Sequence, residues 1–221
     1  MDGSVLPALS VTLRVALAAT VLCGLPGVAL GYLLARRSFP GKIAVETLSA
    51  LPLVLPPTAV GFLLLRLFSL DGPLGAAGLS FDVLLTWKGA VLASAAMAFP
   101  LVARTARVAF EGVEPRLETM ARSLGFSRTR VLVAVTLPLA RRGLLAAVAL
   151  GFGRALGEFG ATAIVAGSIA GETQTLSLLI YEELNLGHDA AALRLVGLTA
   201  VLAFGVLFAV ERLLRAKGVA R

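Results

Sequence analysis

Two opposite charges inside an apolar stretch are the clearest candidates for chemistry. Arg154 and Glu158 lie four residues apart in GFGRALGEFGATAIVAG, so a helix would place them on one face as an ion pair. A lone charge at the centre of a bilayer costs about 2.5–3.5 kcal/mol, so both side chains should face protein or water. Two interpretations stay open: a structural ion pair that fixes packing, or a direct contact with a molecule that crosses the membrane.

The rest of the sequence offers no catalytic set. The single cysteine, Cys23, lies in an apolar run, and the single histidine, His188, has no partner at metal-ligand spacing. The sequence contains no Ser–His–Asp arrangement and no Walker A motif, and its glycine-rich stretch at 151–160 follows no strand pattern. We therefore expect no enzyme activity, no catalytic residue, no metal site and no cofactor bound by this chain.

Composition indicates an all-α integral membrane protein. The chain has 221 residues, of which 58% are hydrophobic and 15% charged, whereas a soluble domain carries about 25% charged residues. The whole chain, 1–221, is expected to form a single membrane domain. Its net charge of +7 lies in clusters between apolar runs without interleaved aromatic residues, so nucleic acid is not an expected partner.

About five membrane spans are expected, because about 20 apolar residues cross a bilayer. Prolines interrupt the second run, and irregular backbone at membrane depth survives only against protein or water. This break either serves packing or lines a pathway. The apolar runs are 8–35, 43–68, 84–108, 143–167 and 190–213. The candidates for lining a pathway are Pro56, Pro57, Thr58, Arg154, Glu158 and Thr162.

Glycines in the fourth run predict close helix packing. Gly153 and Gly157 have the small-xxx-small spacing that lets membrane helices approach, and Gly160 follows them. We expect another helix, from this chain or from a second copy, to pack there.

Residues 114–138 are basic and only partly apolar, in contrast to their surroundings. Glu114 can cap a helix and Pro115 suits its first position. Gly125 suits the left-handed turn that ends this helix, and Ser127 can cap a second helix that runs to Leu137. The apolar stripe of the first helix is formed by Leu117, Met120, Ala121 and Leu124.

This segment resembles the EAA loop of ABC-importer permeases, whose pattern is E-A-A, three residues, G, nine residues and I-x-L-P. Ala121 and Gly125 match the pattern, whereas Thr119 and Met120 replace the motif's Glu and first Ala. Glu118 lies one residue before the missing carboxylate. The resemblance implies docking on a cytoplasmic ATPase, and the alternative is an ordinary loop. The implied coupling residues are Glu114, Pro115, Leu117, Glu118, Thr119, Met120, Ala121, Arg122, Leu124, Gly125, Leu137 and Pro138.

Basic residues predict the orientation. The segments 36–42, 104–142 and 212–221 carry nearly all the flanking Lys and Arg, whereas the loops at 69–83 and 168–189 carry none. The positive-inside rule places the first set in the cytoplasm. We therefore expect the N-terminus outside and the C-terminus in the cytoplasm.

Beyond the loop, the segments 51–65, 87–101, 154–167 and 171–184 resemble the molybdate ABC transporter permeases, including the RxLGEFGAT block. The resemblance implies a type I ABC importer permease in the bacterial inner membrane, with molybdate or tungstate as cargo. It also implies a homodimer, an ABC ATPase dimer that uses ATP and Mg, and a periplasmic oxyanion-binding protein. Sulfate is the alternative cargo. An ATP-independent secondary transporter or channel is the alternative class, although the chain shows no evident internal repeat.

Overall fold

The computed structural model describes residues 2–77 and 83–216. Part of the expected loop at 69–83 and the end of the basic tail, 217–221, lie outside this range. All regular elements in the described ranges are helical. In order they are α1 (Asp2–Arg36), α2 (Lys42–Val54), α3 (Pro57–Phe68), α4 (Pro73–Ala76), α5 (Trp87–Glu111), α6 (Pro115–Ser123), α7 (Arg128–Val131), the π-helical η1 (Leu132–Thr136), α8 (Leu137–Leu156), α9 (Gly160–Val165), α10 (Leu176–Asn185) and α11 (Asp189–Ala216).

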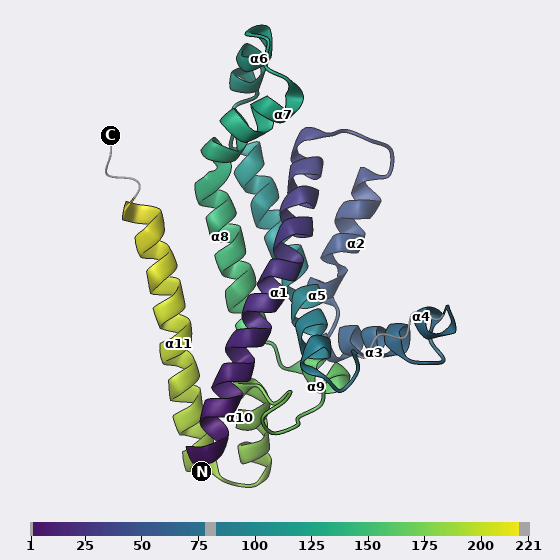
Figure 1. Ribbon diagram of the computed structural model, residues 1–221, viewed down its shortest axis with the longest axis vertical. Coiled ribbons are helices and arrows are strands. Elements are labelled where there is room, and N and C mark those ends of the chain that lie inside the picture. The colour runs from purple at the N-terminus through teal and green to yellow at the C-terminus, as the bar shows by residue number, and fades with distance from the viewer. Residues whose placement is uncertain (1, 78–82, 217–221) are drawn as a thin grey trace.

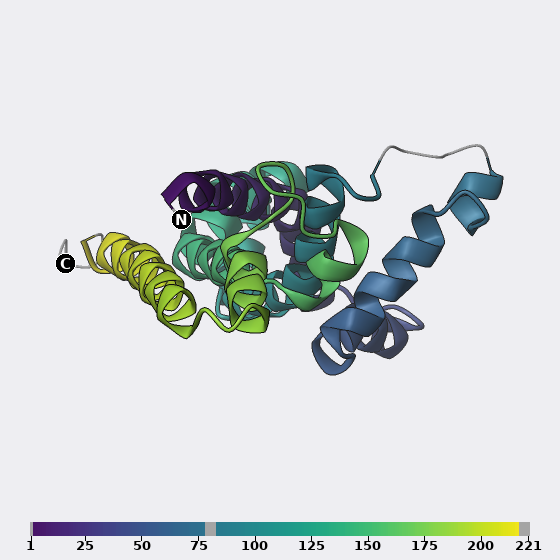
Figure 2. The same ribbon diagram turned by 90° about the horizontal axis from the view of Figure 1, so that it is seen from below.

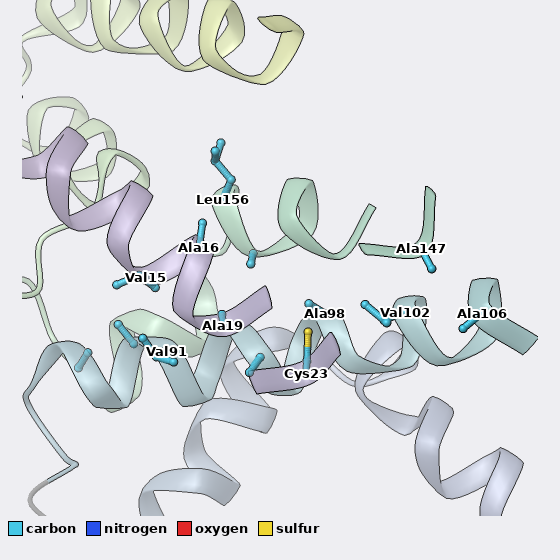
Figure 3. Packing of buried hydrophobic residues seen from close by; sticks show 14 of the residues in the cluster. Val15, Ala16, Ala19, Cys23, Val91, Ala98, Val102, Ala106, Ala147 and Leu156 are labelled. Carbon is cyan, nitrogen blue, oxygen red and sulfur yellow. The ribbon is translucent and has the colours of Figure 1, made fainter. Parts of the chain in front are cut away.

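The core lies where α1, α5 and α8 pack side by side (Figures 1 and 3). Small residues dominate this contact: Ala16, Ala19, Ala98, Ala106 and Ala147 are fully buried. Because the bilayer is as apolar as these side chains, close van der Waals contact between helices supplies the packing energy, and small residues permit it. The sequence therefore builds a tight three-helix centre to which the other helices attach.

Within the described residues, five segments are long and apolar enough to cross a membrane, as expected. They are Ser4–Arg36, Pro57–Ala76, Trp87–Glu111, Arg128–Leu156 and Asp189–Ala209. The first, third and fifth agree with the runs that the sequence indicated. The second and fourth differ from them in their bounds.

The second run, expected at 43–68, is broken into two helices. Helix α2 ends at Val54, and α3 begins at Pro57, which occupies its first turn where the missing N–H costs nothing. Helix α2 lies beside the bundle, whereas α3 leaves it sideways (Figures 1 and 2). The break predicted from the prolines is thus present at Leu55 and Pro56.

The prediction of one continuous fourth span at 143–167 is wrong. The helical segment starts earlier, at Arg128, and α8 ends at Leu156. Residues 157–159 are not helical, and α9 then starts at Gly160. Glycine is a poor helix former, and the Glu158 carboxylate accepts the Ala161 N–H of the new helix, which stabilises a fresh start.

The basic segments that were expected to share one side of the membrane lie at one end of the molecule. Figure 1 shows α6 with α7 at the top, the α1–α2 connection and the end of α11 below them in the upper half, and the N-terminus and α10 at the bottom. Helix α10 is amphipathic. Leu176 and Leu179 are buried on its inner side, and Leu184 is exposed.

Candidate functional site

Helix α6 projects from the end of the bundle and is closed by a glycine turn (Figure 1). Gly125 has φ of +84°, as predicted. The Gly125 N–H donates to the Arg122 carbonyl and the Phe126 N–H to the Ala121 carbonyl, which is the Schellman arrangement. Pro115 occupies the first turn. Glu114 stands at the N-cap position, but its side chain makes no capping hydrogen bond, so that part of the prediction is wrong.

The apolar stripe of α6 is mostly uncovered. Leu117, Met120 and Leu124 are 40%, 64% and 77% exposed, whereas Ala121 is buried against the rest of the chain. Thr119 and Arg122 are also exposed. An exposed apolar cluster on a projecting helix, with basic side chains around it, is typical of a protein-binding surface.

Glu118 points the other way, into the protein. Its Oε1 lies 3.0 Å from Nη2 of Arg36 and 3.1 Å from Nε of the same guanidinium. The hydroxyl of Thr136 donates to this same oxygen at 2.8 Å. Arg36 ends α1 and Thr136 ends η1, so Glu118 joins three elements. The Glu118 carboxylate is therefore buried, whereas the side chain of Thr119, one residue later, is exposed.

The second helix of the loop begins as predicted and ends elsewhere. The Arg130 N–H donates to the Ser127 side chain, which caps α7. The helix was expected to stop at Leu137 and Pro138, but it runs on through η1 into α8. Proline cannot donate to the carbonyl one turn earlier, and the π-helical segment just before Pro138 accommodates this missing bond within a continuous helix.

Arg154 and Glu158 form the expected ion pair, with 2.6 Å between Nη1 and Oε2. They do so across the end of α8 rather than along one helix face, because the helix stops at Leu156. The other oxygen of Glu158, Oε1, accepts the Ala161 N–H at 2.8 Å. The Glu158 side chain is 1% exposed and that of Arg154 is 28% exposed. This arrangement favours a structural ion pair over a carboxylate open to cargo.

The two predicted pathway segments meet. If a Cβ atom were added to Gly160, it would lie 2.9 Å from Cβ of Pro57 and 3.5 Å from the Thr58 nitrogen. The start of α9 therefore touches the start of α3. Pro56, Pro57 and Thr58 are exposed. Thr162 is fully buried, and its hydroxyl has no hydrogen-bond partner among the described residues. Within one chain, Thr58 is therefore accessible and Thr162 is not.

The glycines of the fourth run behave differently from one another. Gly160 packs tightly against α3, whereas a Cβ on Gly153 would meet no atom within 4 Å in the described chain. The nearest atom to a Cβ on Gly157 is the Gly153 carbonyl oxygen at 3.9 Å. Among the residues that the structure describes, Gly153 and Gly157 thus make no close helix contact, and their packing against a second copy stays a prediction.

Three residues of the site were missed from the sequence. Arg36 looked like a basic flank, Thr136 like a residue of the second helix, and Gly61 like part of an apolar run. A Cβ on Gly61 would lie 2.9 Å from the Cα of Ala161, which makes it the second close approach between α3 and α9. No local pattern signals these contacts, because each partner is distant in sequence.

Known proteins that are similar in sequence to this chain include permease proteins of transport systems. The molybdenum transport system permease protein ModB of Haemophilus influenzae is 46% identical over 180 residues, which cover 79% of this chain and 77% of that protein. The sulfate transport system permease protein CysT of Salmonella typhimurium is 35% identical, covering 96% and 77%.

A solved structure shares the fold. The inward-facing MetNI methionine ABC transporter matches with a TM-score of 0.76 at 20% identity and covers 98% of this chain and 97% of its own. Residues 27–216 match the family model of binding-protein-dependent transport system inner membrane components. The described chain has five apolar helical segments and the fold of an ABC importer permease. It belongs to the family of binding-protein-dependent transport system inner membrane components.

Proposed function

We propose that this chain is the membrane permease subunit of an ATP-driven importer and that its cargo is molybdate. The family and the likeness to ModB support the transport class. The observation that carries the proposal is α6: a projecting helix, closed by Gly125, whose Leu117, Met120 and Leu124 are exposed. An ATPase subunit that covers this stripe would supply the apolar contact that the chain leaves open.

The partners follow from this role. A cytoplasmic ABC ATPase dimer binds α6, hydrolyses ATP with Mg and drives the transport cycle, while an extracytoplasmic binding protein delivers the oxyanion. Two copies of the permease form the pathway on their shared axis, since one five-span chain is too small to enclose it with ease. The end with α6 and the basic segments lies in the cytoplasm, and the N-terminus lies outside.

The pathway runs past the junction of α3 and α9. Broken backbone occurs at Leu55 and Pro56 and again at 157–159, and both breaks need protein or water rather than lipid around them. Thr58 is the accessible hydroxyl at this junction, and weak contacts of this kind suit a conduit because tight binding would trap the cargo. Arg154 neutralises Glu158 and so removes a charge that would repel a dianion.

Sulfate is the second candidate cargo, because CysT is also a relative, at lower identity than ModB. Molybdate and sulfate are both tetrahedral dianions, so the permease itself offers few means to separate them, and selection rests mainly on the binding protein.

The ATPase contact is tested by capture of a purified cytoplasmic ABC ATPase of the molybdate type. Met120→Glu places a charge in the exposed apolar stripe and should abolish capture, because the charge would have to be desolvated in the interface. Thr119→Glu adds the same charge one residue earlier and restores the motif carboxylate, so it should capture the ATPase normally. Undiminished capture by Met120→Glu would contradict the docking surface, and transport without any ATPase would favour the secondary-transporter class.

A further inference from the structure

The attachment of α6 to the rest of the chain is mainly polar. Only Glu118 and Ala121 of α6 are buried, and the methyl group of Ala121 offers little apolar area. The larger apolar side chains of α6, Leu117 and Met120, stay 40% and 64% exposed. The ionic and hydrogen-bonded contacts of Glu118 therefore hold this helix in place.

The guanidinium of Arg36 donates hydrogen bonds to two residues at the start of the loop, Glu118 and Val113. Besides its bonds to Glu118, its Nη2 donates to the carbonyl of Val113 at 2.9 Å, just before the helix begins. The side chains of Arg36 and Glu118 are 13% and 9% exposed, so water screens their attraction weakly. This is a charge-assisted contact with two donors of one planar group, which fixes orientation as well as distance.

The third member, Thr136, connects Glu118 to the helix that follows the loop. Thr136 is 1% exposed and lies at the end of the π-helical segment, directly before α8. Helices α1 and α8 both belong to the packed core (Figure 3). A displacement of α6 that carries Glu118 along must therefore pull on α1 through Arg36 and on α8 through Thr136.

We propose that Glu118 is the positioning residue that locks α6 to the ends of α1 and α8, so that movement of a docked ATPase reaches both core helices together. The lock explains why residue 118 is a carboxylate while the motif position, Thr119, has none. The Glu118 carboxylate faces inward and transmits the movement of α6 to the core helices. The exposed residues of α6 make the docking contact. This inference rests on the proposed function for the identity of the docked partner.

The test compares Glu118→Gln, which keeps the shape and loses the charge, with Glu172→Gln, the same change at an exposed acid outside the loop. We expect Glu118→Gln to capture the ATPase within about twofold of the wild type while molybdate uptake per ATP hydrolysed falls by about tenfold. Arg36→Gln should have the same effect, and the double variant should lose no more than either single change, because one link is broken in all three.

A second measurement, the mobility of a spin label on α6, tests the lock without relying on transport. A spin label on Arg122→Cys, in a Cys23→Ser background, should become more mobile when Glu118→Gln or Thr136→Val is added, but not when Glu172→Gln is added. Unchanged mobility in the Glu118 variant would overturn the proposal. Loss of ATPase capture in that variant, with Arg36→Gln normal, would also overturn it and would place Glu118 in the docking contact. Failure of the wild type to take up molybdate would refute the proposed cargo, while the mobility result would still decide whether the lock exists.

Discussion

Glu158→Gln tests the interpretation of the buried charge pair in the membrane. The substitution keeps a side-chain oxygen that accepts the Ala161 N–H, so the start of α9 retains its hydrogen bond. It removes only the negative charge that lies 2.6 Å from the Arg154 guanidinium. Arg154 is then left charged at membrane depth without its partner.

The magnitude follows from burial. Breaking a buried ion pair from one side costs about 3–5 kcal/mol, because the remaining charge is uncompensated. Since the Arg154 side chain is 28% exposed, the lower end, about 3 kcal/mol, is expected. For a chain of 150–250 residues each kcal/mol lowers the Tm by about 2–4 °C, so Glu158→Gln should lower it by about 6–12 °C.

The assay is thermal unfolding of the purified permease, followed by the amount of monodisperse protein that survives heating. Glu172→Gln, which neutralises an exposed acid in the following loop, is the matched control and should change the Tm little. The double variant Arg154→Gln/Glu158→Gln should recover most of the loss, because no charge remains unpaired. If Glu158→Gln melts with the wild type while transport is lost, the carboxylate acts on cargo and the structural interpretation is refuted.

Three further predictions concern the loop, the pathway and the topology. Gly125→Val should reduce ATPase capture, because a β-branched residue at φ of +84° is strained by at least about 1–2 kcal/mol and would distort the turn; normal capture and transport would contradict this. In a variant without the native cysteine, Thr58→Cys should react with a water-soluble thiol reagent and Thr162→Cys should not; the reverse pattern would place the pathway behind α9. A reporter fused after Arg221 should be found in the cytoplasm and one inserted after Ala77 outside, whereas the opposite pair of locations would refute the orientation.

Much of the fold was predictable because the bilayer imposes simple rules. Apolar length gave the number of spans, and the prolines of the second run correctly located the break before α3. The glycine of the loop was also predictable, since few other residues tolerate its backbone angle. Each of these features depends on residues that are adjacent in sequence.

The features that could not be predicted depend on distant contacts or on competing bonds. The end of α8 at Leu156 arises because the Glu158 carboxylate accepts a hydrogen bond from the Ala161 N–H. A pattern of hydrophobic residues does not reveal this hydrogen bond. The helix continues through Pro138 because a π-helical segment accommodates the missing bond. The inward direction of Glu118 depends on Arg36, 82 residues earlier in the chain, so its role at the loop could not be derived from spacing.

The most direct test of the proposed function is uptake of labelled molybdate into proteoliposomes that contain this chain, the ATPase and the oxyanion-binding protein. We expect uptake only with ATP and Mg inside, none when the ATPase is omitted, and weaker competition by sulfate than by unlabelled molybdate. Uptake that persists without the ATPase would contradict an ATP-driven importer, and uptake of sulfate in preference to molybdate would contradict the proposed cargo.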